Sequence, residues 1–64
     1  MCQMSVVMQN NETREKIMDA VARLEVTAEG VVLNALFEQP RPLPGVTVKE
    51  IDFLDGVVVL VPHG

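Results

Sequence analysis

The sequence contains a single cysteine, no tryptophan or tyrosine, and only two phenylalanines in 64 residues. One cysteine cannot form a disulfide within the chain, and so short a chain buries only about 60% of the surface that its unfolded form exposes. Domains of this size usually gain stability from a disulfide, a metal ion or a partner chain. Because 48% of the residues are hydrophobic, we expect one domain over residues 1–64 that forms a homodimer.

Basic residues are also few, since five Lys and Arg against nine Asp and Glu give a net charge of −4. Proteins that bind nucleic acids use Lys and Arg to displace counterions from phosphate, and they often add aromatic side chains that stack on bases. Here the aromatic residues are only Phe37 and Phe53, and the basic residues are scattered: Arg14, Lys16, Arg23, Arg41 and Lys49. The composition therefore disfavours a nucleic-acid partner.

Long apolar runs are absent, the longest being Val57 to Val61, which is too short to cross a bilayer. The N-terminus lacks the basic and long apolar regions of a signal peptide. The lack of signal-peptide features, together with a free thiol, favours a cytoplasmic location. There is no phosphate-binding loop and no C-x-x-C motif, and a Cys2–His63 nucleophile pair would join two terminal segments. The sequence therefore predicts a protein that is not an enzyme.

Short β-branched segments separated by turn residues dominate the rest of the chain. Ser5–Met8 and Val57–Val61 predict strands, the second buried on both faces. Glu29-Gly30 and Asp55-Gly56 predict turns, which gives hairpins with return strands at Val31–Glu38 and after Gly56. Val46–Leu54 predicts a strand with a bulge between Val48 and Ile51, where the alternation slips.

Two stretches are harder to assign. Ile17, Val21 and Leu24 have helical spacing, so residues 16–20 predict either a strand or one helical turn, followed by a strand over Ala22–Ala28. The segment that contains Pro40, Pro42, Pro44 and Gly45 predicts a stiff loop, since proline cannot donate to a β-ladder. Together these features predict an all-β domain, either a small antiparallel β-barrel or a two-sheet sandwich.

Cys2 is chemically distinctive because it follows the initiator methionine. Removal of Met1 would give Cys2 a free α-amine beside its thiolate, and both groups can lose protons to a metal near neutral pH. They would close a five-membered chelate ring, to which the backbone nitrogen of Gln3 can add an amidate ligand. His63 is a further candidate for a secondary metal contact, whereas Met4 and Met8 are better explained as core residues.

Two such N,S pairs give a four-coordinate planar site, a geometry that suits Ni(II) or Cu(II) better than the tetrahedral Zn(II). One chain supplies only one thiolate, so two chains would share one ion. The metal site and the predicted homodimer thus support each other.

Several segments resemble the CooT family of small nickel-binding proteins: Met1-Cys2 before a Val-rich strand, Leu24-Glu25-Val26, Leu36-Phe37, Pro44-Gly45, and Ile51-Asp52 followed by Gly56-Val57-Val58. The resemblance implies a homodimeric all-β domain that binds one nickel ion through the N-terminal cysteine of each subunit. It also implies a role as metallochaperone, store or sensor in nickel homeostasis, with the nickel-dependent carbon monoxide dehydrogenase as the client of the founding member. Only Cys2 carries over as a functional residue. The alternative is a small RNA- or protein-binding module without metal, a label that relatives have also received.

Overall fold

The computed structural model describes residues 3–63, which form a single sheet of six strands. The strands are β1 (Met4–Asn10), β2 (Thr13–Val26), β3 (Gly30–Ala35), β4 (Arg41–Pro44), β5 (Val46–Asp52) and β6 (Val57–Pro62). Their order across the sheet is β4-β3-β2-β1-β6-β5. The described residues contain no helix, and hence none suited to crossing a membrane.

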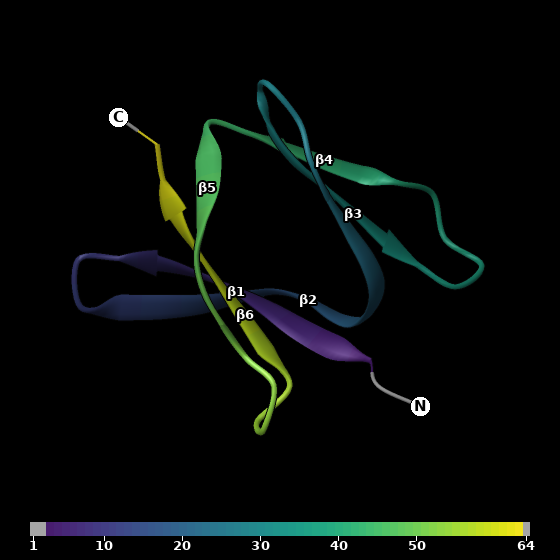
Figure 1. Ribbon diagram of the computed structural model, residues 1–64, viewed down its shortest axis with the longest axis horizontal. Coiled ribbons are helices and arrows are strands. Elements are labelled where there is room, and N and C mark those ends of the chain that lie inside the picture. The colour runs from purple at the N-terminus through teal and green to yellow at the C-terminus, as the bar shows by residue number, and fades with distance from the viewer. Residues whose placement is uncertain (1–2, 64) are drawn as a thin grey trace.

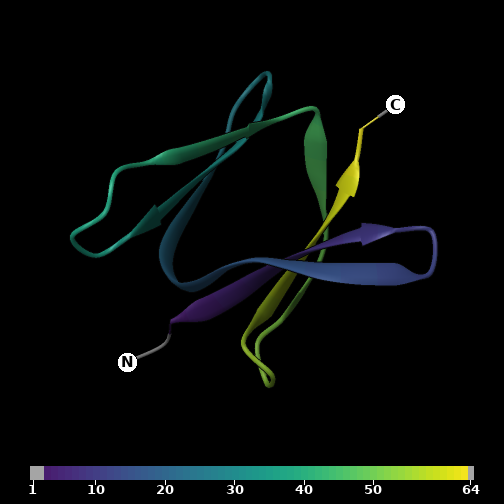
Figure 2. The same ribbon diagram turned by 180° about the vertical axis from the view of Figure 1, so that it is seen from behind.

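The sheet curls into a half-barrel, which brings β3 into contact with β5 (Figures 1 and 2). The predicted all-β class is confirmed, but the residues form one curled sheet and not a two-sheet sandwich. The expectation of a wholly antiparallel arrangement is wrong for one pair, because β1 runs parallel to β6 from Ser5↔Val57 to Met8↔Leu60. The homodimer stays a prediction.

Strand β2 is continuous, so the helical turn considered for residues 16–20 does not form. Ala20 has a φ of 56°, and the pairing of β2 with β3 slips between Val21 and Arg23. Side chains in a strand point alternately to its two faces, and each irregularity reverses that order for the residues that follow. As a result Ile17, Val21 and Leu24 all pack on the core despite their helical spacing.

The proline-rich segment is not a loop, as the sequence suggested, but the edge strand β4. It pairs only with β3, with Val31 opposite Leu43 and Val32 opposite Pro42. An edge strand tolerates proline because one side of it needs no ladder donors. Strand β3 is correspondingly shorter than predicted and ends at Ala35, after which residues 36–40 form the connection to β4.

The predictions for the C-terminal hairpin are largely confirmed. The pairing of β5 with β6 slips between Val48 and Glu50, where a bulge was expected. The turn after β5 covers residues 53–56 and ends at Gly56, whose φ of 69° suits glycine. Within β6, Val58 and Leu60 belong to the core cluster, and Val59, which points to the other face, is also buried.

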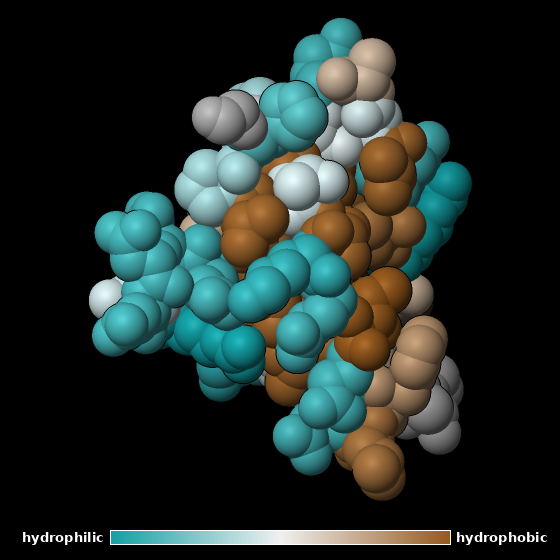
Figure 3. All heavy atoms as spheres, turned by 60° about the vertical axis from the view of Figure 1, so that its left-hand side comes forward, coloured by the Kyte–Doolittle hydropathy of each residue, from teal (hydrophilic) through white to brown (hydrophobic). Residues whose placement is uncertain are grey.

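The core lies on the concave side of the sheet. Its buried cluster consists entirely of aliphatic side chains: Val6, Val21, Val31, Leu33, Val58 and Leu60. The partly buried side chains packed against it include Met4 and Met8. These two methionines are therefore packing residues, as the sequence indicated. The space-filling view shows that further hydrophobic side chains reach the surface between hydrophilic ones (Figure 3).

Candidate functional site

The predicted ligand Cys2 lies outside the described residues, and Gln3 is the first residue that the structure describes. Gln3 is exposed and precedes β1. Its carbonyl oxygen lies beside Gly56, where a Cβ added to the glycine would lie 3.8 Å from it. The Ser5 N–H donates a 2.8 Å hydrogen bond to the Gly56 carbonyl oxygen. The turn between β5 and β6 thus fixes the chain immediately after the predicted metal ligand.

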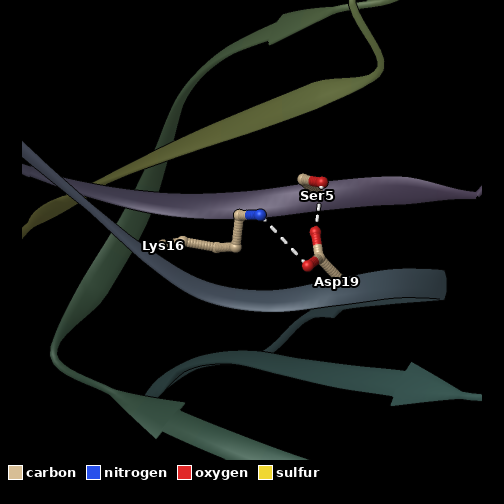
Figure 4. A network of polar contacts seen from close by, with 3 residues as sticks. All are labelled: Ser5, Lys16 and Asp19. Atoms are coloured by element: carbon tan, nitrogen blue, oxygen red, sulfur yellow. Dashed lines mark hydrogen bonds and ion pairs between the residues drawn. The ribbon is translucent and has the colours of Figure 1, made fainter.

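The side chain of Ser5 adds a second attachment, to β2. Its hydroxyl donates a 2.7 Å hydrogen bond to Asp19 Oδ1, and Lys16 Nζ donates a 3.1 Å bond to Asp19 Oδ2 (Figure 4). The bond from Ser5, followed by the interactions with Lys16, lowers the pKa of Asp19 below its ordinary value of 3.8. Because the side chains of Lys16 and Asp19 are exposed and Ser5 is only partly buried, this network positions the start of β1 more than it stabilises the whole fold.

His63 lies at the other end of the molecule. Strands β1 and β6 are parallel, with Ser5 beside Val57 at the start of β6. His63 follows the end of β6, and its N–H donates a 2.8 Å bond to the Gly45 carbonyl oxygen. Six residues at about 3.3 Å each separate Val57 from His63 by roughly 20 Å along the strand. The structure therefore does not bring Gln3 and His63 together in one chain.

Carboxylates and His63 do not assemble a metal site on their own. Within residues 3–63, no three side chains of the His, Cys, Asp and Glu types lie close enough to hold an ion. Two shallow cavities, of about 260 and 150 Å³, lie around the turn between β2 and β3 and share Thr27, Glu29 and Gly30. The smaller one also contacts His63. Both are remote from the start of β1, so they are separate from the predicted metal site.

The N-terminal end of the sheet also presents apolar side chains, which the sequence analysis did not identify as functional. In the turn between β5 and β6, Phe53 is 82% exposed and Leu54 is 97% exposed. In the connection between β3 and β4, Leu36 is 55% exposed and Phe37 is 102% exposed. The sequence feature that could have indicated these exposed side chains is that both phenylalanines lie next to turn segments. A large hydrophobic side chain in a turn has little opportunity for burial within its own small domain.

The two edges of the sheet are protected against pairing with another strand. Pro42 and Pro44 remove backbone donors from β4, and the outer strand β5 carries a bulge at the charged residues Lys49 and Glu50. Proline, charge and bulges are the usual devices that prevent edge-to-edge association. Any contact with another chain is therefore better served by the exposed apolar turns than by the strand edges.

A protein-family model described as "CO dehydrogenase accessory protein CooT" matches residues 1–61. The chain belongs to the CooT family. The match includes both Cys2 and the apolar turns, and the family description names an accessory protein of an enzyme, in agreement with the prediction that the chain itself is not an enzyme. None of the curated proteins compared with the sequence matches it.

A crystal structure assigned to CooT from Carboxydothermus hydrogenoformans has the same fold. It aligns with a TM-score of 0.85 over 98% of this chain and 100% of that chain, at 24% sequence identity. At this identity the likeness establishes the fold and carries no residue roles. The curled half-barrel is thus a fold that another CooT protein also adopts.

Proposed function

We propose that this CooT protein binds Ni(II) as its cargo, one ion per pair of chains, through the thiolate and α-amine of Cys2 and the backbone nitrogen of Gln3, and that it serves in the maturation of CO dehydrogenase. The observation that carries the proposal is the position of Cys2 directly after Met1, at the first residues that the family model matches. The amine and thiolate of one residue form a chelate that suits a planar nickel site.

The geometry of the N-terminal end supports this proposal. Gln3 is exposed, and Ser5, two residues later, is hydrogen-bonded to Gly56 through its N–H and to Asp19 through its hydroxyl. An exposed segment that follows directly into a fixed strand can present its donors to an ion without any rearrangement of the core. Binding thus requires loss of protons from the ligands, but no unfolding of β1.

The surface area of the chain supports the pairing of two copies. A monomer of 7.0 kDa is expected to expose about 4,000 Å², whereas this chain exposes 4633 Å². The open, curled sheet thus leaves more surface exposed than an average chain of its mass. Phe53 and Leu54 lie beside the start of β1, so a contact between two such turns would bring the two N-termini together. In Figure 3 hydrophobic and hydrophilic side chains lie together at the lower end of the molecule.

Titration of the purified protein with Ni(II), followed by absorption spectroscopy, tests the proposal. We expect a thiolate-to-nickel charge-transfer band that saturates at about one ion per two chains. Cys2→Ser should abolish the band, whereas His63→Gln, the matched control at the opposite end, should leave it unchanged. If Cys2→Ser binds nickel as well as the parent protein does, the proposed site is wrong.

A further inference from the structure

Strand β2 forms a bulge opposite Ser5. The strand pairs on either side of this residue are Met4↔Val21 and Val6↔Met18. Two residues of β2, Asp19 and Ala20, therefore lie opposite one residue of β1, which is the defining feature of a β-bulge. The backbone ladder between the two strands is interrupted at Ser5 as a result.

The bulge has a backbone conformation that its own residues disfavour. Ala20 has a φ of 56°, in the left-handed region that is unfavourable for a residue with a Cβ. Bulges are frequent next to functional sites, where they change the direction of a side chain. Strained residues also cluster at such sites, where the surrounding contacts maintain them. We therefore ask what the side chain beside Ala20, that of Asp19, does.

The carboxylate of Asp19 reaches across to β1. The Ser5 hydroxyl donates a 2.7 Å hydrogen bond to Asp19 Oδ1, and Lys16 Nζ donates a 3.1 Å bond to Asp19 Oδ2 (Figure 4). Each carboxylate oxygen thus has its own donor, so the group cannot turn away from Ser5 without loss of both contacts. A side-chain bond therefore joins the two strands at the point where the backbone ladder is interrupted.

Ser5 is also held by its backbone, on the side of β6. Its N–H donates a 2.8 Å hydrogen bond to the Gly56 carbonyl oxygen. The backbone nitrogen of Gln3, a proposed nickel ligand, precedes that of Ser5 by two residues and so lies within about 7 Å of it. A ligand group that is restrained before binding loses less conformational freedom when the ion binds, and this raises affinity.

We propose that Ser5 and Asp19 are positioning residues of the nickel site: the bulge at Ala20 directs Asp19 toward Ser5, and the bond between them restrains the Gln3 end of β1 for the ion. The inference rests on the proposed function for the identity of the ion. It adds two residues that act on the site without contacting the metal, and it gives the strained conformation of Ala20 a role.

Two measurements on the full-length protein test this role. In the nickel-free protein, the heteronuclear 1H–15N NOE of the Gln3 amide measures its restraint, and Ser5→Ala and Asp19→Ala should each lower it. Titration of the same samples with Ni(II) should give a dissociation constant that is raised about two- to tenfold. The thiolate-to-nickel band should keep its wavelength, because neither residue is a ligand.

Conservative variants separate positioning from a general effect on the fold. Ser5→Thr keeps the hydroxyl and Asp19→Asn keeps an acceptor oxygen, so both should bind nickel like the parent protein. Ala20→Gly, which adopts positive φ without strain, should do the same. Glu25→Ala is the matched control, because it removes the exposed 3.6 Å ion pair with Arg23 on the other half of β2. It should change neither measurement.

The positioning role would be overturned by parent-like nickel affinity in Ser5→Ala, by an equal loss in Glu25→Ala, by a shifted band in Ser5→Ala, or by failure of Ser5→Thr to restore binding. These results leave the proposed function intact as long as the parent protein binds nickel through Cys2. A parent protein that binds no nickel contradicts the proposed function itself, and this inference with it.

Discussion

The hydroxyl of Ser5 and the carboxylate of Asp19 are joined by a 2.7 Å hydrogen bond between β1 and β2. The bond lies where the pairing of these strands slips, between Met4↔Val21 and Val6↔Met18. A backbone ladder is weakest at such an irregularity. The side-chain bond thus secures the start of β1, and with it the position of the predicted nickel ligands, at the point where the backbone ladder is interrupted.

This bond predicts a defined effect on the titration of Asp19. Because the hydrogen bond from Ser5 is the largest cause of the lowered pKa, Ser5→Ala should raise the pKa of Asp19 toward 3.8, and Lys16→Gln, which removes a charged donor, should also raise it. A carboxylate with a lowered folded-state pKa stabilises the fold above its unfolded pKa, and the contribution disappears as pH falls through the folded value. The stabilisation by this carboxylate is therefore present above about pH 4 and is lost as the pH falls below that value. NMR titration of the side-chain carboxyl carbon measures both pKa values, and an unchanged value in Ser5→Ala would contradict this assignment.

Replacement of Ala20, in the middle of β2, by glycine should stabilise the fold. Its φ of 56° is unfavourable for a residue with a Cβ and costs roughly 1–2 kcal/mol, while glycine loses about 0.5–1 kcal/mol more conformational entropy on folding. We therefore expect Ala20→Gly to raise the free energy of unfolding by about 0.5–1 kcal/mol. Urea denaturation measures the change. Ala22→Gly, in the same strand at a residue without positive φ, should instead lower stability, and equal effects of the two variants would refute the explanation.

Replacement of Gly30 by alanine should destabilise the fold, because there is no space for a side chain at this position. A Cβ at this position would overlap the carbonyl oxygen of Leu43 in the neighbouring strand β4. We expect Gly30→Ala to cost about 2–3 kcal/mol, out of roughly 3–10 kcal/mol available to a domain of this length. Gly45→Ala is the control, since its Cβ would meet nothing within 4 Å and only the φ of 76° opposes it. Its cost should be about 1 kcal/mol. Thermal unfolding ranks the two variants, and a larger effect at Gly45 would show that the contact with Leu43 is tolerated.

Much of the fold follows from sequence patterns, and the errors have specific physical causes. The pairs Asp55-Gly56 and Glu29-Gly30 marked real turns, and the run of valines before Leu60 predicted a strand buried on both faces. The alternation in β2 was obscured because Ala20 adopts a conformation that its side chain disfavours. The segment with Pro42 and Pro44 was misassigned because only the sheet order shows that it forms an edge, where missing donors are harmless.

Less of the candidate site than of the fold could be predicted from the sequence. Its chemistry depends on the order of Met1 and Cys2, which the sequence shows directly. The grouping of the apolar turns around the start of β1 depends on pairings such as Ala35↔Val21 and Met4↔Val21, which join residues more than 13 positions apart. No local pattern encodes these pairings. The bulge that directs Asp19 toward Ser5 was equally invisible, because nothing in residues 18–21 requires the positive φ of Ala20.

The central claim is that one Cys2 provides half of a nickel site and that a second chain provides the other half. Native mass spectrometry of the protein after addition of Ni(II) measures the number of chains, the number of ions and the presence of Met1 in a single experiment. The account predicts a species of two chains, both without Met1, that carries one nickel ion and is lost in Cys2→Ser. A species of one chain with one ion, or a nickel-bound dimer of Cys2→Ser, would contradict it.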